Sequence, residues 1–412
     1  MLRQTILNFI YYKTMKQKLI YAATAALMFT VGSAYAQTGN VASTFQNGSN
    51  NTATTTQNAG MTNMVEIQQV GSEHDATVMQ NNGERNNAMI QQRGTNNDAT
   101  TAQYGGYDND LRVVQLGADN DAAVLQSGGR MHDASVHQVG RNNEADAIQE
   151  GGMDNDIWIK QEGGDRNDAY VVQMGGMRNE ADLYQKGHDN EGDIGQYNGS
   201  MNSAAIDQDG MRNEAYVRQE SGMMNSASSE QDGENNTSQL MQDGGTGNMA
   251  MSEQRGWSNT ADVAQAGGMN NAAMVVQAGT GNMAMVSQNG SEANNAEVAQ
   301  SGEYNTAIVA QAGEYDNNAW VTQSGMSNVA AVLQLSGRYN NAYITQNGEG
   351  NIATAAQVGM YNMAMINQEG WYNVAGSSQV GQHNTTMINQ TGIGNTAGVL
   401  QVGTNNMATI NQ

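Results

Sequence analysis

The 412-residue sequence contains no proline, whereas an average usage of about 5% would supply roughly 20. Proline cannot donate to a β-ladder and is tolerated mainly at sheet edges, so its exclusion favours one long sheet system with few edge positions. Cysteine is also absent, which excludes disulfides and thiolate metal sites. Aromatic residues make up only 6% of the chain, and large aliphatic residues are few. A thick core of Leu and Phe is therefore excluded, and any packed interior must be thin and partly polar.

Basic residues are scarce, since 17 Lys and Arg stand against 40 Asp and Glu and give a formal net charge of -23. Nucleic acids and anionic membranes are bound through clustered Lys and Arg, so this balance argues against both as partners. The sequence has five histidines and no nucleophile elbow, phosphate loop or zinc-binding helix motif. We therefore expect no enzymatic activity, no cofactor and no metal centre.

Residues 1–36 have the features of an export signal. Two lysines precede an apolar run over residues 19–31, and Ala-Tyr-Ala at 34–36 gives the small-x-small pattern of a cleavage site. The apolar run is shorter than the ~20 residues that a membrane span needs. We therefore expect a cleaved signal peptide at 1–36, with Met15 as an alternative start, then a short segment at 37–39 and no membrane span.

One short unit recurs through residues 40–412. Thirty-three glutamines mark it, from Gln46 to Gln412, and of the intervals between them eighteen span eleven positions and fourteen span twelve. Six residues before the marker stands Asn in thirty-one units, and His74 and His132 are the two exceptions. Ala stands four residues before it in twenty-seven units, Val or Ile usually two before it, and Gly two after it in twenty-seven of thirty-two. The unit is therefore Asn-x-Ala-x-[Val/Ile]-x-Gln-x-Gly.

The period of two within the unit predicts a strand, because positions two apart share one face of a strand but are spread around a helix. Asn, Gly and β-branched residues in each unit also disfavour a helix. Four or five residues, commonly Gly-rich, separate each Gln from the next Asn, and glycine supplies the positive φ that a tight reversal needs. The expected fold class is all-β: a β-solenoid, or amyloid-like β-helix, whose 33 strand-turn half-repeats form about 16.5 two-strand rungs.

Asn and Gln share a strand face with Ala and Val, so the pattern places polar side chains in the interior. Identical residues stacked about 4.8 Å apart can pass amide hydrogen bonds from rung to rung, which satisfies groups that burial would otherwise penalise. The small, uniform Ala and Val or Ile between them suit a dry zipper between facing strands. We predict self-assembly through these ladder residues, represented by Asn40, Ala42, Gln46, Asn51, Ala53, Gln57, Asn271, Ala273, Val275, Gln277, Asn305, Ala307, Val309, Gln311, Asn395, Ala397, Val399, Gln401, Asn406, Ala408, Ile410 and Gln412.

The repeat resembles the curlin repeat of curli, the bacterial functional amyloid. Residues 401–412 (QVGTNNMATINQ) carry the pattern Gln-x-Gly-x-x-Asn-x-Ala-x-x-x-Gln, and residues 265–277 (QAGGMNNAAMVVQ) carry it with one extra turn residue. The resemblance covers residues 40–412 and implies the role of a bulk (major) subunit in an extracellular, cell-surface fibre. It also implies export through the periplasm and an outer-membrane secretion channel, a nucleator subunit as partner, and a role in biofilm matrix and adhesion.

Both ends of the repeat region are expected to be open to pairing. The last ladder residue is Gln412, and the first strand begins a few residues after the expected cleavage site. An unpaired strand edge recruits another chain, so we expect head-to-tail stacking, a heterologous contact that gives an open homopolymeric filament. The alternatives are a soluble β-solenoid adhesin stalk and a cation-binding surface protein.

Acidic residues follow the ladder Asn or His in eleven units between Asp75 and Glu214. They are expected to point outward beside the turns, where rows of carboxylates can bind calcium. The favoured interpretation is that they are solvated gatekeepers against premature aggregation. The candidate gatekeepers are Asp75, Asp98, Asp110, Asp121, Asp133, Asp156 and Asp168. Residues 257–412 hold only eight acidic residues and one basic residue, so this part is expected to assemble more readily.

Overall fold

The computed structural model describes residues 39–313 and 315–412. Every regular element in these residues is a β-strand, so this part of the chain contains no helix that could cross a membrane. Residues 39–412 form one structural unit. The expected signal peptide at 1–36 lies outside the described residues, as do the first two residues of the segment at 37–39.

Thirty-three strands follow one another along the described chain. The odd-numbered strands are β1 (Val41–Ser49), β3 (Met64–Ser72), β5 (Asn87–Thr95), β7 (Asp110–Ala118), β9 (Asp133–Arg141), β11 (Asp156–Asp165), β13 (Glu180–His188), β15 (Ser203–Met211), β17 (Ser226–Glu234), β19 (Met249–Trp257), β21 (Ala272–Thr280), β23 (Asn295–Glu303), β25 (Asn318–Met326), β27 (Asn341–Glu349), β29 (Met363–Trp371), β31 (Thr385–Ile393) and β33 (Met407–Asn411). The even-numbered strands are β2 (Thr52–Asn58), β4 (Asp75–Asn81), β6 (Asp98–Tyr104), β8 (Asp121–Ser127), β10 (Glu144–Glu150), β12 (Asp168–Met174), β14 (Glu191–Tyr197), β16 (Glu214–Glu220), β18 (Thr237–Asp243), β20 (Thr260–Ala266), β22 (Met283–Asn289), β24 (Thr306–Ala312), β26 (Val329–Arg338), β28 (Ile352–Met360), β30 (Val374–Gln382) and β32 (Thr396–Thr404).

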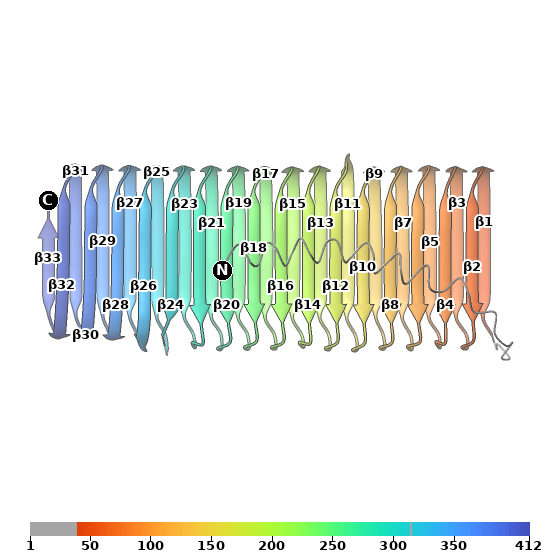
Figure 1. Cartoon of the computed structure of the whole chain (residues 1–412), viewed down its shortest axis with the longest axis horizontal. Helices are drawn as coiled ribbons and strands as arrows, with labels where there is room; N and C mark the ends of the chain where they lie inside the picture. The colour runs from red at the N-terminus through yellow and green to blue at the C-terminus, as the bar shows by residue number, and fades with distance from the viewer. Residues whose placement is uncertain (1–38, 314) are drawn as a thin grey trace, which may run out of the picture. The chain divides into compact units, whose positions relative to one another are not determined.

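Each strand pairs in parallel with the strand two places further along the chain, which separates odd and even strands into two sheets. The odd sheet has 17 strands and the even sheet 16, and Figure 1 shows both in chain order from β1 to β33. Pairing is in register, so that equivalent positions meet, as Gln219 meets Gln242 between β16 and β18. The expected all-β solenoid of about 16 two-strand turns is confirmed.

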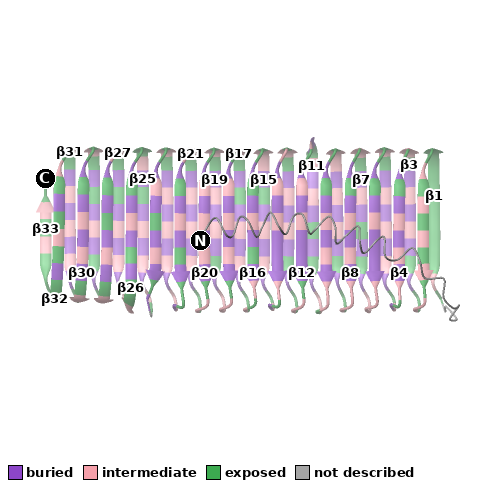
Figure 2. Cartoon of the chain, viewed as in Figure 1, coloured by how far each residue is buried: buried purple, intermediate pink, exposed green. Residues whose placement is uncertain are grey.

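The core is the space between the two sheets. Burial alternates along nearly every strand, as the banding in Figure 2 shows, because successive side chains point to opposite faces. The inward apolar positions are Ala and Val or Ile, for example Ala261 and Val263 in β20, and they are almost completely buried. Asn and Gln are buried beside them. The interior is therefore thin and partly polar, as the shortage of large apolar residues predicts.

The turns differ in length between the two ends of each rung. After an odd strand, the next ladder Asn or His usually lies five residues beyond Gln, as His74 does after Gln69. After an even strand, it usually lies six residues beyond Gln. From Gln346 onward the distance from Gln to the next Asn is five residues at both ends of the rung. Each rung then has 22 residues, one fewer than the usual 23, and Gln346 stacks on Gln368. The two turn types then share one backbone pattern, with Gly359 and Gly370 at φ 114° and 112°.

Candidate functional site: ladders and outer rows

The inward glutamines form a continuous side-chain ladder in each sheet. Gln242 is typical, since its Nε2 donates to Gln265 Oε1 at 2.8 Å and its Oε1 accepts from Gln219 Nε2 at 2.7 Å. The same Nε2 lies 2.9 Å from the carbonyl oxygen of Ser226 in the opposite sheet and 3.0 Å from that of Asn248. Each glutamine therefore links successive rungs and also joins the two sheets.

The asparagine ladder uses the backbone as well as the side chains. Asn305 Nδ2 donates to Asn282 Oδ1 at 3.1 Å, and the Asn305 backbone N–H donates to the same oxygen at 3.0 Å. Asn305 Nδ2 also contacts the carbonyl oxygen of Gly325 at 3.0 Å. The sequence predicts only the amide-to-amide relay. The asparagines in addition hold the turns in place, because each Oδ1 fixes the first backbone N–H of the unit above it.

Histidine substitutes for asparagine at two of these positions. Nδ1 of His74 accepts the backbone N–H of Asn97 at 3.3 Å, and Nδ1 of His132 accepts that of Asn155 at 3.3 Å. Burial lowers the pKa of both imidazoles, which favours the neutral form needed to accept this bond. Nε2 of His132 is buried without a hydrogen-bond partner. These histidines therefore perform the backbone-accepting role of asparagine, and His132 does so with one polar atom unsatisfied.

Glycine near the end of most odd strands is required by close packing of the backbone, in addition to its φ. A Cβ built on Gly233 would lie 2.1 Å from the carbonyl oxygen of Gly256 on the next rung, at φ 124°. Many positive-φ turn positions next to the ladder Asn carry other residues, such as Asn235 at φ 56°. From the sequence, glycine is expected only because it permits the tight reversal of the chain between strands. The signal was that this position is always Gly after the glutamine of an odd strand, whereas all five exceptions in the chain follow the glutamine of an even strand: Ala59, Asn82, Asn198, Ser221 and Ser336.

The predicted ladder residues occupy equivalent inward positions, and their burial depends on their rung. Those in the middle rungs are at most 2% exposed: Asn271, Ala273, Val275, Gln277, Asn305, Ala307, Val309 and Gln311. Those in the first and last rungs range from buried to exposed: Asn40, Ala42, Gln46, Asn51, Ala53, Gln57, Asn395, Ala397, Val399, Gln401, Asn406, Ala408, Ile410 and Gln412. The end rungs thus expose groups that a further rung would cover.

Comparison with known protein families agrees with this repeat. The family described as the curlin associated repeat matches residues 106–140, 132–163, 176–210, 202–233, 316–348, 343–370 and 381–412. The chain is a curlin repeat protein. No curated protein matches it.

The curlin repeat protein carries a row of like charges on the outer face of its even sheet, which we call the carboxylate row. Its members are consecutive in register from β4 to β16: Asp75, Asp98, Asp121, Glu144, Asp168, Glu191 and Glu214. On the odd sheet, Asp110, Asp133, Asp156 and Glu180 form a shorter row. All seven candidate gatekeepers lie in these two rows.

Burial and mutual repulsion raise the pKa of Asp121 in the carboxylate row and of Asp156 in the shorter row, and so disfavour their ionisation. Partial burial is the main cause that raises the pKa of Asp121 to about 6, and the negative charges of Asp98 and Glu144 add to this effect. Partial burial is also the main cause that raises the pKa of Asp156 to about 6, and Asp133 and other neighbouring acidic residues add to it. Like charges placed directly opposite each other on adjacent strands are destabilising. At Asp121 and Asp156 the stacked acids therefore oppose formation of this curlin solenoid at neutral pH.

Opposite charges pair between rungs in the neighbouring turns and strand ends. Arg166 makes two hydrogen bonds to Asp189, at 2.6 Å and 2.9 Å, and Lys186 lies 2.6 Å from Asp209. Such exposed pairs contribute about 0–1 kcal/mol each. The turns of the curlin solenoid thus contain mixed charges that attract one another, whereas the carboxylate row stacks one sign alone.

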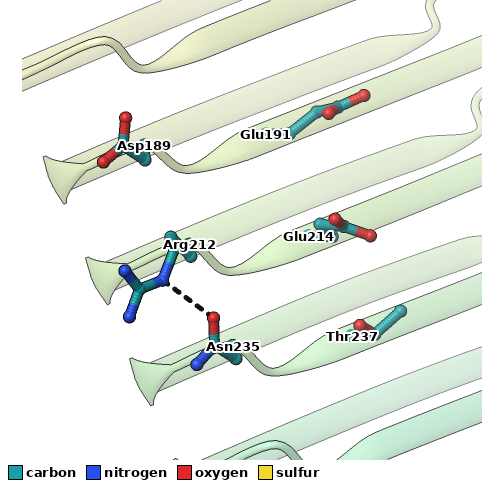
Figure 3. Close-up of a pocket in the computed structure, with 6 residues that line it drawn as sticks. All are labelled: Asp189, Glu191, Arg212, Glu214, Asn235 and Thr237. Atoms are coloured by element: carbon teal, nitrogen blue, oxygen red, sulfur yellow. Dashed lines mark hydrogen bonds between the residues drawn. The ribbon is translucent and has the colours of Figure 1, made fainter.

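A hollow of about 260 Å³ lies where these turns meet the carboxylate row. Its lining consists of Asp189, Glu191, Arg212, Glu214, Asn235 and Thr237. Figure 3 shows Arg212 donating from Nε to Asn235 Oδ1, at 2.9 Å, while Glu191 and Glu214 extend from neighbouring strands. Among the described residues, no group of three or more His, Asp or Glu side chains is arranged to hold a metal ion. Its lining comes from equivalent positions on three successive rungs, such as Glu191, Glu214 and Thr237, so the hollow is a section of the repeating outer surface of the curlin repeat protein.

Proposed function

We propose that this curlin repeat protein is a non-enzymatic structural subunit of an extracellular, curli-like amyloid fibre. Copies add end to end, each new copy continuing both sheets of the previous one. The fibre then serves in biofilm matrix and surface adhesion, and a nucleator subunit and an outer-membrane channel act as partners. These finer roles rest on the family resemblance, and the export signal rests on the sequence pattern of residues 1–36.

The observation that carries this proposal is the state of the end rungs. All residues of β1 are exposed, whereas the equivalent residues Val65, Ile67 and Gln69 of the next odd strand are completely buried. At the other end, Ile410 of β33 is half-buried, although Ile388 one rung below is fully buried. Among the described residues, these outermost strands pair on one side only, and a parallel in-register strand would satisfy the open side.

The two ends are also complementary to each other. Both present Asn, Ala, an inward β-branched residue and Gln at the same spacing, as in 40–46 and 406–412. A contact between the top of one copy and the bottom of another joins different surfaces, so it does not close on itself. Repetition of that contact generates an open filament with the strand spacing of cross-β structure.

The first test follows assembly directly. The chain is diluted from denaturant, amyloid-dye fluorescence is followed with and without preformed seeds, and the product is examined by fibre diffraction. We expect seeded growth and a meridional reflection at about 4.7 Å. A stable β-rich monomer that seeds do not convert contradicts the proposal and favours the soluble adhesin stalk.

A second test locates growth at the end rung. Ile410→Glu places a charge on the inward side of β33, and the control Thr409→Glu places the same charge on the outward side of the same strand. We expect seeded elongation to slow for Ile410→Glu, because the next copy would have to bury an unpaired carboxylate. Equal elongation rates for both variants would show that growth does not proceed through this edge.

A further inference from the structure

The outward side of the even sheet changes character along the chain. Between the Asn and Gly positions of β22, β24, β26, β28, β30 and β32, all of which are described, the outward side chains include no charged residue. We call this surface the apolar face. Two columns of aliphatic side chains run along it, represented by Val329, Ile352 and Val374 on one side and by Leu335, Val358 and Val380 on the other, each 36–42% exposed.

The apolar face belongs to one sheet only. Among the odd strands at the same level, β21 also has only apolar outward residues, whereas β23 to β31 present mainly polar ones, such as Asn341, Thr345 and Asn347 in β27. Both sheets have the same inward pattern, so the repeat itself does not require this difference. Outward apolar residues gathered on one face of one sheet therefore call for an explanation beyond solenoid folding.

The size of the apolar face matches what a stable protein contact needs. Six strands at about 4.8 Å, each with seven residues at about 3.3 Å, span about 29 Å by 23 Å, or roughly 670 Å². Two such faces in contact would bury roughly 1,300 Å², which falls within the range of about 1,200–2,000 Å² for specific interfaces.

The charges elsewhere on the even sheet restrict how two copies can meet. From β4 to β16 the outward positions carry eleven acidic residues and one basic residue, Arg218. Packed sheets lie about 10 Å apart. If two copies met with their solenoid axes parallel, these acidic surfaces would face each other. An antiparallel arrangement, with a two-fold axis along the strands, joins the apolar faces and leaves the two acidic surfaces at opposite ends of the pair.

We propose that the apolar face is a docking surface for a second copy of this chain, which packs on it face to face and antiparallel. This lateral contact goes beyond the proposed end-to-end growth, because it uses a sheet face, and neither contact needs the other. The interface is isologous, with the same residues contributed by both copies.

The test compares two double variants that add the same charge. Leu333→Glu with Ile352→Glu alters the apolar face, and Thr322→Glu with Asn347→Glu alters exposed positions of the opposite sheet that, like the first pair, do not face each other. Sedimentation velocity is measured on the freshly diluted full chain before fibres form, circular dichroism checks the β-structure, and seeded elongation is measured in parallel. We expect dimers for the unaltered chain and the control, and a dissociation constant raised about 100-fold or more for the apolar-face variant.

A cross-linking measurement tests the orientation without relying on the charged variants. The chain has no cysteine, so Met283→Cys in β22 and Thr396→Cys in β32 can each carry a single thiol for a bis-maleimide that spans about 10 Å. Antiparallel docking predicts cross-links between the two variants when they are mixed, and not between copies of one variant. Cross-links within one variant, or none, overturn the proposed arrangement.

Three further outcomes decide the proposal. An unaltered chain that stays monomeric at its highest soluble concentration overturns it, even if seeded elongation is normal and the fibre function stands. Loss of dimers in the control as well as in the apolar-face variant also overturns it. Dimers that form normally in a chain that never elongates support the docking surface and contradict the fibre function.

Discussion

The glutamine ladder gives the sharpest prediction about stability. Gln242→Leu removes a fully buried amide and keeps a side chain of similar size, whereas Gln239→Leu in the same strand, β18, changes an outward, half-buried position. The first substitution removes four hydrogen bonds and leaves Gln265 Oε1 without its side-chain donor. Gln219 Nε2 keeps the carbonyl oxygens of Ser203 and Asn225, so the damage is confined to neighbouring rungs.

The magnitude follows from these contacts. A typical intramolecular hydrogen bond contributes about 0.5–1.5 kcal/mol net, and an unsatisfied buried group costs about 1–3 kcal/mol. Burial of leucine offsets part of the loss, so we expect Gln242→Leu to destabilise its rungs by about 2–4 kcal/mol. The outward Gln239→Leu should stay within about 0.5 kcal/mol.

Amide hydrogen exchange measures this locally. In a repeat protein each rung interacts mainly with its neighbours, so the effect should be concentrated in strands β16, β18 and β20 and fade in distant rungs. At about 1.4 kcal/mol per factor of ten, exchange there should accelerate roughly 30- to 1,000-fold for Gln242→Leu. Equal acceleration in both variants, or none in either, would refute the view that the buried amides hold the rungs together.

The other predictions concern the turns, the histidines and the acidic rows. Gly233→Ala should lower the free energy of unfolding in urea by about 3–5 kcal/mol, because its Cβ would clash with the carbonyl oxygen of Gly256. The control Gly290→Ala has open space around its Cβ and should lower it by about 1–2 kcal/mol. Equal losses in the two variants would contradict the close-packing argument. His132→Asn should raise stability by about 1 kcal/mol by removing the unsatisfied Nε2, and an unchanged urea midpoint would argue against this. The raised pKa of Asp121, about 6, means that the folded chain binds this proton more tightly than the unfolded chain. The stability contributed by protonated Asp121 is therefore fully present below the pKa of this group in the unfolded chain, and it is lost as the pH rises through 6. The urea midpoint should rise when the pH is lowered from 7 to 5, and Asp121→Asn should make this rise smaller. An identical pH profile in the variant would exclude a role for this carboxyl.

The fold class and the inward pattern could be predicted from the repeat alone. Residues two apart repeat thirty-three times, and only strands place such residues on one face, so the all-β solenoid could be predicted without coordinates. The interior position of Asn and Gln also followed from their fixed register. The roles of these residues in self-assembly, and the boundaries of the exported segment, remain predictions, because they concern contacts with other molecules or residues outside the described chain.

The tertiary structure was needed to show which side chains and which backbone atoms meet between neighbouring rungs. Asp98 and Asp121 belong to different rungs, and their repulsion arises from the pairing of β6 with β8, which places them opposite each other. The same stacking brings the Gly233 and Gly256 backbones into contact and gathers the aliphatic columns of β26, β28 and β30 on one face. The physical reason is that the local period of two fixes which face a residue occupies, whereas its neighbours one rung away depend on turn length. Turn length varies by a residue from rung to rung, because paired residues are 24 positions apart between β10 and β12, 23 between β16 and β18, and 22 between β29 and β31. The resulting register determines which charges, glycines and apolar side chains meet.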